Sequence, residues 1–236
     1  IAKEVLDEGG QIGFSHLPDR PDDARQRNRR RVAMLTDEQP NARFLMPMDA
    51  GNDEQIAAVM QKAGEEFGTI DFLVHSIAFC PMDDLKGETV ETSREGFRIA
   101  METSVYSLLA VTRHARGILA DNASVLTLTY FGGEKAVPGY NIMGVCKAAL
   151  DASVRYMAYE LGPKGVRVNA VSAGPLRTLA GRGAGVEEML TFYERVAPLG
   201  RNVTHEEVGK SGAWLLSKES TGITGEILHV DAGYNI

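Results

Sequence analysis

Short apolar runs alternate along the chain with longer segments whose apolar positions recur at helical spacing. The short runs have the length of strands, and they are residues 11–16, 43–48, 71–75, 124–129, 166–171 and 226–230. The helical patterns lie near residues 52–67, 93–118, 140–161, 186–195 and 204–217. Strands that are apolar on both faces and separated by helices indicate a parallel sheet covered on both sides. The sequence therefore predicts one α/β domain over residues 1–236, with a doubly wound parallel sheet whose ligands bind at the carboxyl ends of the strands.

The chain opens in helical rhythm at Ile1, with Gly9 and Gly10 at the expected end of the helix, and the strand 11–16 follows at once. This is the order of the second half of a β-α-β unit. In a doubly wound sheet the first strand lies between the second and the fourth, which here are 11–16 and 71–75. We expect that first strand to precede Ile1 in a longer protein. The strands 11–16 and 71–75 should then stand about 10 Å apart, without hydrogen bonds between them.

The composition is that of an ordinary soluble globular protein, with 44% hydrophobic and 24% charged residues. The balance of 25 Lys and Arg against 32 Asp and Glu gives a net charge of −7, which argues against a nucleic-acid partner. No window approaches the ~18 uninterrupted apolar residues that a membrane span requires. Cys80 and Cys146 are too few for a disulfide scaffold and form no CxxC pair for zinc. We therefore expect no metal site. No signal peptide is visible, so we expect a reducing, cytoplasm-like compartment.

Residues 18–31 interrupt the alternation with a run rich in proline, aspartate and arginine. The arginines could bind the 2′-phosphate of NADPH or a nucleic acid. Alternatively, they form the solvated face of a helix that runs to about Thr36, paired locally with the interspersed aspartates. Charge runs are usually solvated faces, which favours the second interpretation.

Polar and small residues follow the second and third strand candidates. Asp49, beside Ala50, could accept a hydrogen bond from an adenine amino group or could satisfy backbone N–H groups in a turn. The small residues of segment 75–81 would let a ribose or a nicotinamide approach the backbone, unless the segment is only a strand exit. His75 by itself is more often a hydrogen-bonded core histidine than a catalytic group.

The most informative combination of polar residues follows the fourth strand candidate. Tyr130 ends that strand, Gly132-Gly133 come next, and Tyr140 and Lys147 stand on one face of a predicted helix, about 10 Å apart along its axis. A lysine so placed can hold the ribose hydroxyls of a cofactor, and its charge would favour the tyrosinate form of a nearby phenol. A lone tyrosine and lysine at this spacing are usually surface residues. Two tyrosines and a lysine after one strand, beside two glycines, are less ordinary.

Glycines also flank a short amphipathic stretch after the strand 166–171. The segment 172–180 leads to Gly181, Gly183 and Gly185, and the amphipathic stretch follows. Glycines around a short helix are what a mobile lid over a pocket requires, and a plain surface loop is the alternative. The sequence thus predicts a mobile substrate lid over residues 178–198.

Three segments of the sequence are distinctive, namely Val-His-Ser-Ile-Ala at 74–78, Tyr-Asn-Ile-Met-Gly at 140–144 and Ser-Ala-Gly-Pro-Leu-Arg-Thr at 172–178. They resemble signatures of the short-chain dehydrogenase/reductase superfamily, and within it of the enoyl-(acyl carrier protein) reductases of bacterial and plastid fatty-acid synthesis. The discriminating motif is a tyrosine seven residues ahead of a lysine, here Tyr140 and Lys147. Most of the superfamily has a spacing of four, and a catalytic serine where this chain has Tyr130. The resemblance covers almost the whole chain and implies a Rossmann fold.

The resemblance implies that NADH, with NADPH left open, delivers a hydride to a trans-2-enoyl thioester carried on acyl carrier protein. Tyr140 would stabilise the enolate oxygen, Tyr130 would shape the pocket around the thioester and assist proton transfer, and Lys147 would bind the nicotinamide ribose. The implied cofactor contacts follow the strand ends, at Asp49, Ala50, Ile77, Leu176, Arg177, Thr178, Leu179 and Ala180. The backbone of Cys80 would face the acyl substrate.

The sequence departs from the family pattern in two places. The glycine-rich pyrophosphate loop should lie just before Ile1, and Leu17 stands near where some relatives place a polar residue by the adenosine ribose. A 3-oxoacyl or other carbonyl reductase of the same fold is a second interpretation, which Tyr130 and the long tyrosine–lysine spacing oppose. A nucleotide-binding scaffold without activity is a third, which the intact Tyr140 and Lys147 oppose.

The resemblance further implies a homotetramer built partly through the helices near 93–118 and 140–161. These helices carry apolar positions that look able to bury surface between subunits, namely Val105, Leu108, Leu109, Val154 and Met157. The implied compartment is the cytoplasm, or the plastid stroma, without a membrane or nucleic-acid partner.

Overall fold

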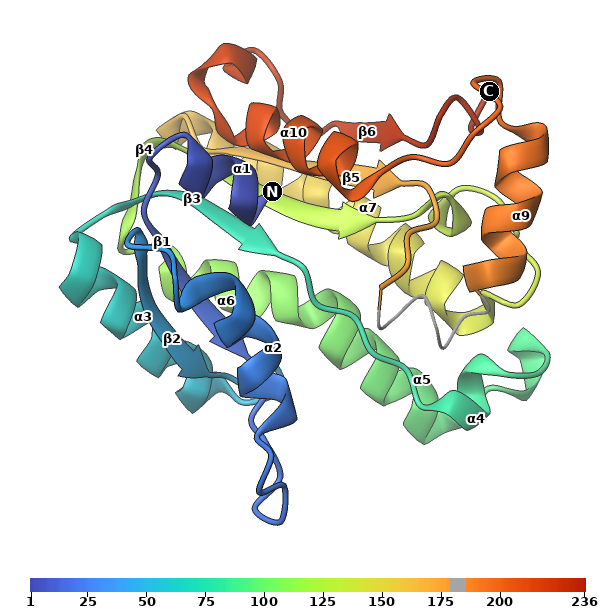
Figure 1. Ribbon diagram of the computed structural model, residues 1–236, viewed down its shortest axis with the longest axis horizontal. Coiled ribbons are helices and arrows are strands. Elements are labelled where there is room, and N and C mark those ends of the chain that lie inside the picture. The colour runs from blue at the N-terminus through green and yellow to red at the C-terminus, as the bar shows by residue number, and fades with distance from the viewer. Residues whose placement is uncertain (179–185) are drawn as a thin grey trace.

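The computed structural model describes residues 1–178 and 186–236, and within them six strands form two parallel sheets (Figure 1). The first sheet pairs β1 with β2, and the second has the order β3-β4-β5-β6. The strands are β1 (Ile12–His16), β2 (Ala42–Pro47), β3 (Ile70–His75), β4 (Leu119–Thr129), β5 (Arg167–Ala173) and β6 (Ile227–Val230). Each predicted strand is confirmed. The largest difference is at β4, which begins at Leu119 because Leu119 pairs with Ile70 ahead of an irregularity in the register.

The hydrogen-bonding ladder is interrupted between β1 and β3. In the described part of the chain, β1 pairs with β2 and β3 pairs with β4, so the expected lack of pairing between these two strands is confirmed. The predicted sheet is therefore two ladders rather than one continuous ladder. All the strand pairs are parallel, so the carboxyl ends in each sheet lie at one edge.

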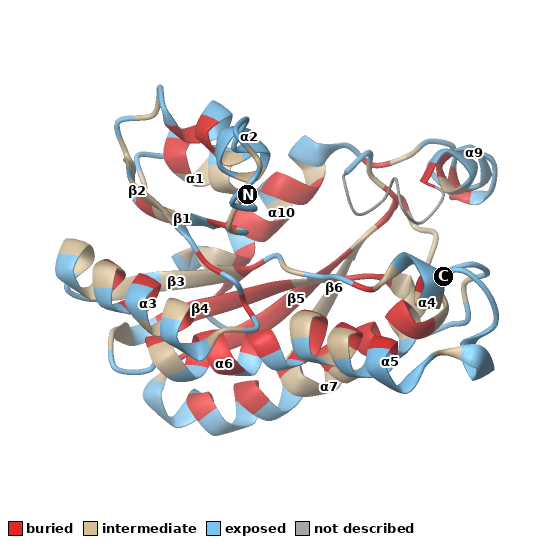
Figure 2. Ribbon diagram, turned by 90° about the horizontal axis from the view of Figure 1, so that it is seen from below, coloured by how far each residue is buried: buried red, intermediate tan, exposed pale blue. Residues whose placement is uncertain are grey.

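Helices cover both faces of the four-stranded sheet. Figure 2 shows α6 and α7 on one side of β4 and β5, and α10 on the other. Consecutive residues of β4 point to opposite faces, because Val125 packs with residues of α6 and α7 while Leu126 packs with residues of α10. In the described part of the chain, the α-helices of at least six residues are α1 (Ala2–Asp7), α2 (Arg27–Thr36), α3 (Asp53–Phe67), α5 (Arg94–Met101), α6 (Ser107–Ala115), α7 (Asn141–Leu161), α9 (Val186–Val196) and α10 (His205–Leu216). The doubly wound arrangement is thus present.

The predicted helix 93–118 is divided. Between α5 and α6 the chain forms a π-helical turn, Glu102–Tyr106. Within that turn, the hydroxyl of Ser104 accepts from the backbone N–H of Phe79 at 3.0 Å and donates to its carbonyl at 3.1 Å. The wider turn therefore supports the loop that follows β3, a contact that helical periodicity does not reveal.

The arginine-rich segment forms the solvated helix that its charge pattern favours. It leads into α2, which ends at Thr36, and Asp23 accepts a hydrogen bond from the Arg27 guanidinium at 2.8 Å. Asp19 accepts from the backbone N–H groups of Asn28 and Arg29 and so satisfies the start of the helix. Its arginines are exposed.

Four of the five apolar positions expected between subunits lie instead in the chain's own core. Val105, Leu108, Val154 and Met157 are buried against neighbouring elements, and Leu109 alone of the five is exposed, at 39%. The apolar faces of these helices therefore cover this chain's own sheet and neighbouring helices.

None of the helices in the described residues has the length and apolar character that a membrane span requires.

Candidate active site

Two tyrosines meet at the carboxyl end of β4. Tyr130 follows the strand, and its ring lies 4.7 Å from that of Tyr140, centroid to centroid, in an edge-to-face arrangement. A methyl group on Gly132 would lie 2.5 Å from Cδ1 of Tyr140, so this position must be glycine for the rings to meet. A side chain on Gly144 would meet the Gly132 carbonyl at 2.7 Å, so the first turn of α7 also depends on a glycine to approach this segment.

Lys147 is buried two turns along α7, with 6% of its surface exposed. Its Nζ donates a hydrogen bond to the carbonyl oxygen of Leu128 at 2.7 Å, which directs the ammonium group to the same strand end. Burial lowers the pKa of Lys147 to about 8, and Asp151 acts against that shift. The tyrosine–lysine pair therefore faces the end of β4, as the spacing predicts.

Tyr140 remains a phenol rather than a tyrosinate. Burial raises its pKa above the ordinary value, and Tyr130, Cys146 and Asp151 raise it further. The expectation that the lysine charge favours the tyrosinate form is therefore wrong, because burial dominates the pKa of Tyr140 and its charged neighbours raise that pKa further. A neutral phenol is a hydrogen-bond donor, which is what a developing oxyanion requires.

Asp151 is a buried acid that the sequence analysis missed. It lies one turn after Lys147 on α7 and is 4% exposed, and its Oδ1 atom has no hydrogen-bond partner. Burial raises its pKa, while Thr129 and Lys147 act to lower it. The four-residue spacing from Lys147 on a predicted helix was the available signal.

Tyr193 of α9 is a second missed residue. Its hydroxyl lies 3.0 Å from that of Tyr130, and its ring stacks on Tyr234 with centroids 3.8 Å apart. The buried positions of α9 are Val186, Leu190 and Tyr193, which share one helix face. That periodicity in the sequence predicts that Tyr193 is buried, but it does not predict the hydrogen bond to Tyr130.

His75 is a structural histidine. Its Nδ1 lies 3.0 Å from the hydroxyl of Thr127, and its Nε2 lies 2.8 Å from that of Ser107. Burial, with a smaller effect of Lys147, lowers its pKa to about 4, so the ring is neutral near pH 7. The interpretation of His75 as a hydrogen-bonded core residue is confirmed.

The loop after β3 brings Ile77 and Cys80 to the same edge of the sheet. Ile77 is half-buried beside residues of α3 and α6. Cys80 is buried, its Sγ donates to the Pro81 carbonyl at 3.4 Å, and burial raises its pKa. A thiol in that state is a poor nucleophile, so its chemistry need not enter the reaction.

Asp49 takes part in the turn that follows β2. Its Oδ1 accepts from the backbone N–H of Gly51 at 2.9 Å, and its own N–H donates to the side chain of Gln55 at 2.8 Å. Asp49 is exposed, while Ala50 beside it is buried. Of the two roles left open for Asp49, the structure contains the turn, and an adenine contact stays a prediction.

The segment that follows β5 also lies at the carboxyl edge of the second sheet. Leu176 is half-buried, and the exposed Arg177 pairs with Glu187 at the start of α9 at 3.0 Å. Thr178 donates its backbone N–H to the Leu176 carbonyl. The remaining predicted cofactor contacts, Leu179 and Ala180, lie outside the described residues, as does the part of the predicted lid at 179–185.

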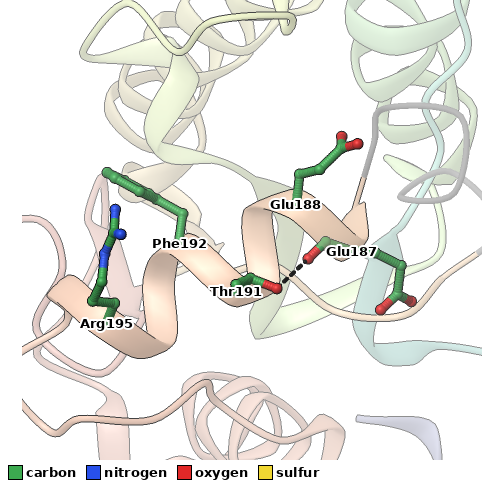
Figure 3. A pocket seen from close by; sticks show the side chains of 5 residues that line it. All are labelled: Glu187, Glu188, Thr191, Phe192 and Arg195. Atoms are coloured by element: carbon green, nitrogen blue, oxygen red, sulfur yellow. Dashed lines mark hydrogen bonds between the residues drawn. The ribbon is translucent and has the colours of Figure 1, made fainter.

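A cavity of about 450 Å³ lies against α9, and residues of that helix line it. Figure 3 shows the lining side chains, which are Glu187, Glu188, Thr191, Phe192 and Arg195. Neither catalytic tyrosine candidate nor Lys147 lines this cavity. We place the site at the strand ends instead, because buried titratable groups converge there. Among the side chains described, no cluster of His, Cys, Asp and Glu is arranged to hold a metal ion.

Known proteins share both the sequence and the fold. A family model described as enoyl-(acyl carrier protein) reductase matches residues 1–235. The chain is 44% identical over 237 residues to the Bacillus cereus enoyl-(acyl carrier protein) reductase named for NADH, covering all of this chain and 90% of that protein. It is 44% identical over 239 residues to the Staphylococcus aureus (strain MRSA252) enzyme named for NADPH, with the same coverage. A crystal structure of the Bacillus cereus enzyme with NADP⁺ and indole naphthyridinone, 43% identical, superposes with a TM-score of 0.92 over all of this chain and 90% of that chain. The chain belongs to the enoyl-(acyl carrier protein) reductase family.

Proposed function

We propose that this protein reduces the double bond of trans-2-enoyl thioesters carried on acyl carrier protein, the last reductive step of fatty-acid elongation. The observation that carries the proposal is the meeting of Tyr130, Tyr140 and Lys147 at the carboxyl end of β4. NADH is the cofactor of the proposal. NADPH stays open, because relatives of equal identity are named for either cofactor.

The residues at the strand ends fit a nicotinamide cofactor. The buried ammonium of Lys147 has three N–H donors, of which one is used on Leu128, so others can reach ribose hydroxyls. Asp49 and Ala50 would hold the adenine, while Ile77 and the segment 176–180 would lie along the nicotinamide. When bound, the cofactor supplies a hydride to the β-carbon of the substrate.

Tyr140 stabilises the negative charge that develops on the thioester oxygen. Its raised pKa keeps the phenol protonated, so the O–H donates to the enolate oxygen and can supply a proton. A donor already in place costs no reorganisation during the reaction. Loss of one such donor typically lowers the rate by ~10²–10³.

Tyr130 shapes the thioester pocket beside Tyr140. Tyr130 is 8% exposed, and burial raises its pKa as well. It is therefore a second neutral phenol at the carboxyl end of β4, in contact with Tyr140. A bulky buried ring there, in contact with Tyr140, favours the enoyl reductase over a carbonyl reductase that uses a small serine. The buried Cys80 would present its backbone to the acyl chain.

We also propose a homotetramer. Several large apolar side chains are exposed on α5, α6, α7 and the turn between α5 and α6, namely Phe97, Tyr106, Leu109, Val145, Tyr156 and Tyr159. Such side chains gathered on neighbouring helices suit subunit contact. Light scattering at micromolar concentration tests this, and a stable monomer would contradict it. A reducing compartment such as the cytoplasm suits the free thiols of Cys80 and Cys146, and cell fractionation tests that location.

NADH consumption with a crotonyl thioester tests the proposed reaction. The same assay with an acetoacetyl thioester separates enoyl reduction from 3-oxoacyl reduction, and a repeat with NADPH reads the cofactor preference. We expect turnover of the crotonyl substrate only. Preference for acetoacetyl, or no oxidation with any enoyl thioester, would contradict the proposal.

A further inference from the structure

The hydroxyl groups of Tyr130 and Tyr193 form a buried hydrogen bond of 3.0 Å. Tyr130 is 8% exposed and Tyr193 only 3%, so water does not replace this bond easily. The two residues come from different elements, the end of β4 and the helix α9. The bond therefore links α9 to Tyr130, the side chain that the proposed function places next to the thioester.

Tyr193 is held by packing on two sides. It lies on the buried face of α9 with Leu190, and Tyr234 stacks on its ring with an interplanar angle of 23°. Tyr234 sits in a turn that is itself fixed, because Asp231 accepts from the backbone N–H groups of Gly233 and Asn235. The Tyr193 hydroxyl is thus placed by fixed neighbours and does not depend on a flexible side chain.

The chemistry of the substrate sets the direction of this hydrogen bond. A thioester oxygen carries no proton, so a phenol that contacts it must donate its own O–H. When Tyr130 donates to the thioester, its oxygen is free to accept, and the hydroxyl of Tyr193 must then be the donor. Burial and the bond to Tyr130 raise the pKa of Tyr193, which keeps that proton in place near neutral pH. Two consecutive hydrogen bonds, from Tyr193 to Tyr130 and from Tyr130 to the thioester oxygen, polarise and strengthen one another.

We propose that Tyr193 is a positioning residue of the reductase, donating to the hydroxyl oxygen of Tyr130 and so aiming the Tyr130 O–H at the thioester oxygen. This inference rests on the proposed function, in particular on the contact between Tyr130 and the thioester. Tyr193 itself touches neither substrate nor cofactor in this account.

A double-mutant cycle tests the role of Tyr193. The variant Tyr193→Phe keeps the ring and its stacking but loses the donor, and we expect kcat/KM for the enoyl thioester to fall about 3- to 10-fold, with NADH affinity unchanged. In a Tyr130→Phe background the same change should cost less than about twofold, because its target hydroxyl is gone. Tyr234→Phe, which removes a neighbouring hydroxyl and keeps the stacked ring, serves as the control and should stay within about twofold of the parent. Thermal unfolding of each variant confirms that it folds.

Each outcome of the cycle decides the question. An unchanged Tyr193→Phe enzyme would overturn the inference and leave the role of Tyr130 intact. Equal losses in both backgrounds would assign Tyr193 a purely structural role and also overturn it. If Tyr130→Phe alone has no effect, the proposed contact between Tyr130 and the thioester fails, and the inference fails with it.

Discussion

Lys147 donates a hydrogen bond from Nζ to the carbonyl oxygen of Leu128 at 2.7 Å, which anchors the buried ammonium at the end of β4. The sheet thereby aims the lysine at the position where a cofactor ribose would lie. The same bond leaves part of the donor capacity of the ammonium for that ribose.

Replacement of this lysine should weaken NADH binding. The variant Lys147→Met keeps the chain length and loses the donors, and because hydrogen bonds to charged groups contribute about 1.5–3 kcal/mol, we expect Kd to rise about 10- to 100-fold. Fluorescence titration with NADH measures this. Lys210→Met, on the exposed face of α10, is the matched control. Equal Kd values for the two variants would contradict the assigned role.

A methyl group at Gly132 should displace the ring of Tyr140. Gly132→Ala places Cβ 2.5 Å from Cδ1 of Tyr140, which is closer than packed atoms tolerate, and 3.2 Å from Cδ1 of Tyr130, which is tighter than most packing contacts. We expect a loss of about 1–3 kcal/mol in the free energy of unfolding, together with a lower kcat. Urea denaturation and steady-state kinetics measure the two effects. Gly222→Ala, where a methyl group meets open space, should change neither, and a Gly132→Ala enzyme that behaves like it would show that the ring is not so confined.

The buried His75 should make stability depend on pH. The unfolded chain takes up a proton at this residue near pH 6.5, whereas the folded protein does so only near pH 4. Because the unfolded state binds more protons in that window, protonation of His75 should remove stability as pH falls from 6.5 to 4, by roughly 3 kcal/mol in total. Urea unfolding across this range should show a shallower dependence for His75→Gln than for the parent. The exposed His205, changed to Gln, should leave the parental dependence in place, and identical curves for all three proteins would refute the assignment.

Much of the fold follows from local patterns. The central strands of the second sheet, β4 and β5, are largely buried between helix layers, so their apolar runs are visible in the sequence, as at Val125 and Leu126. The division of the helix 93–118 was not predictable, because it coincides with a contact between the hydroxyl of Ser104 and the backbone of Phe79, 25 residues earlier, which no local pattern reveals. Helical periodicity also identifies the apolar face of a helix, but it does not show whether that face packs in the chain's own core or against another subunit. Leu108 and Val154 therefore suggested a subunit contact although they pack in the core.

The candidate site, like the fold, could be predicted only in part from the sequence. Tyr130, Tyr140 and Lys147 belong to one strand–helix unit, so their spacing alone brings them together at the end of β4. Tyr130 and Tyr193 are 63 residues apart in the sequence, and their contact forms only when α9 packs near the end of β4. No local spacing of residues therefore predicts this contact. The protonation state of Tyr140 depended on burial, which spacing does not measure.

The kcat of Tyr140→Phe for a crotonyl thioester, measured at saturating NADH, tests the central claim most directly. The variant keeps the ring that packs against Tyr130 and removes the O–H that is proposed to stabilise the enolate oxygen. We predict that kcat falls by ~10²–10³ while the Kd for NADH stays at the parental value. A variant with parental kcat, or one that loses only NADH affinity, would contradict the claim that the Tyr140 phenol acts on the substrate.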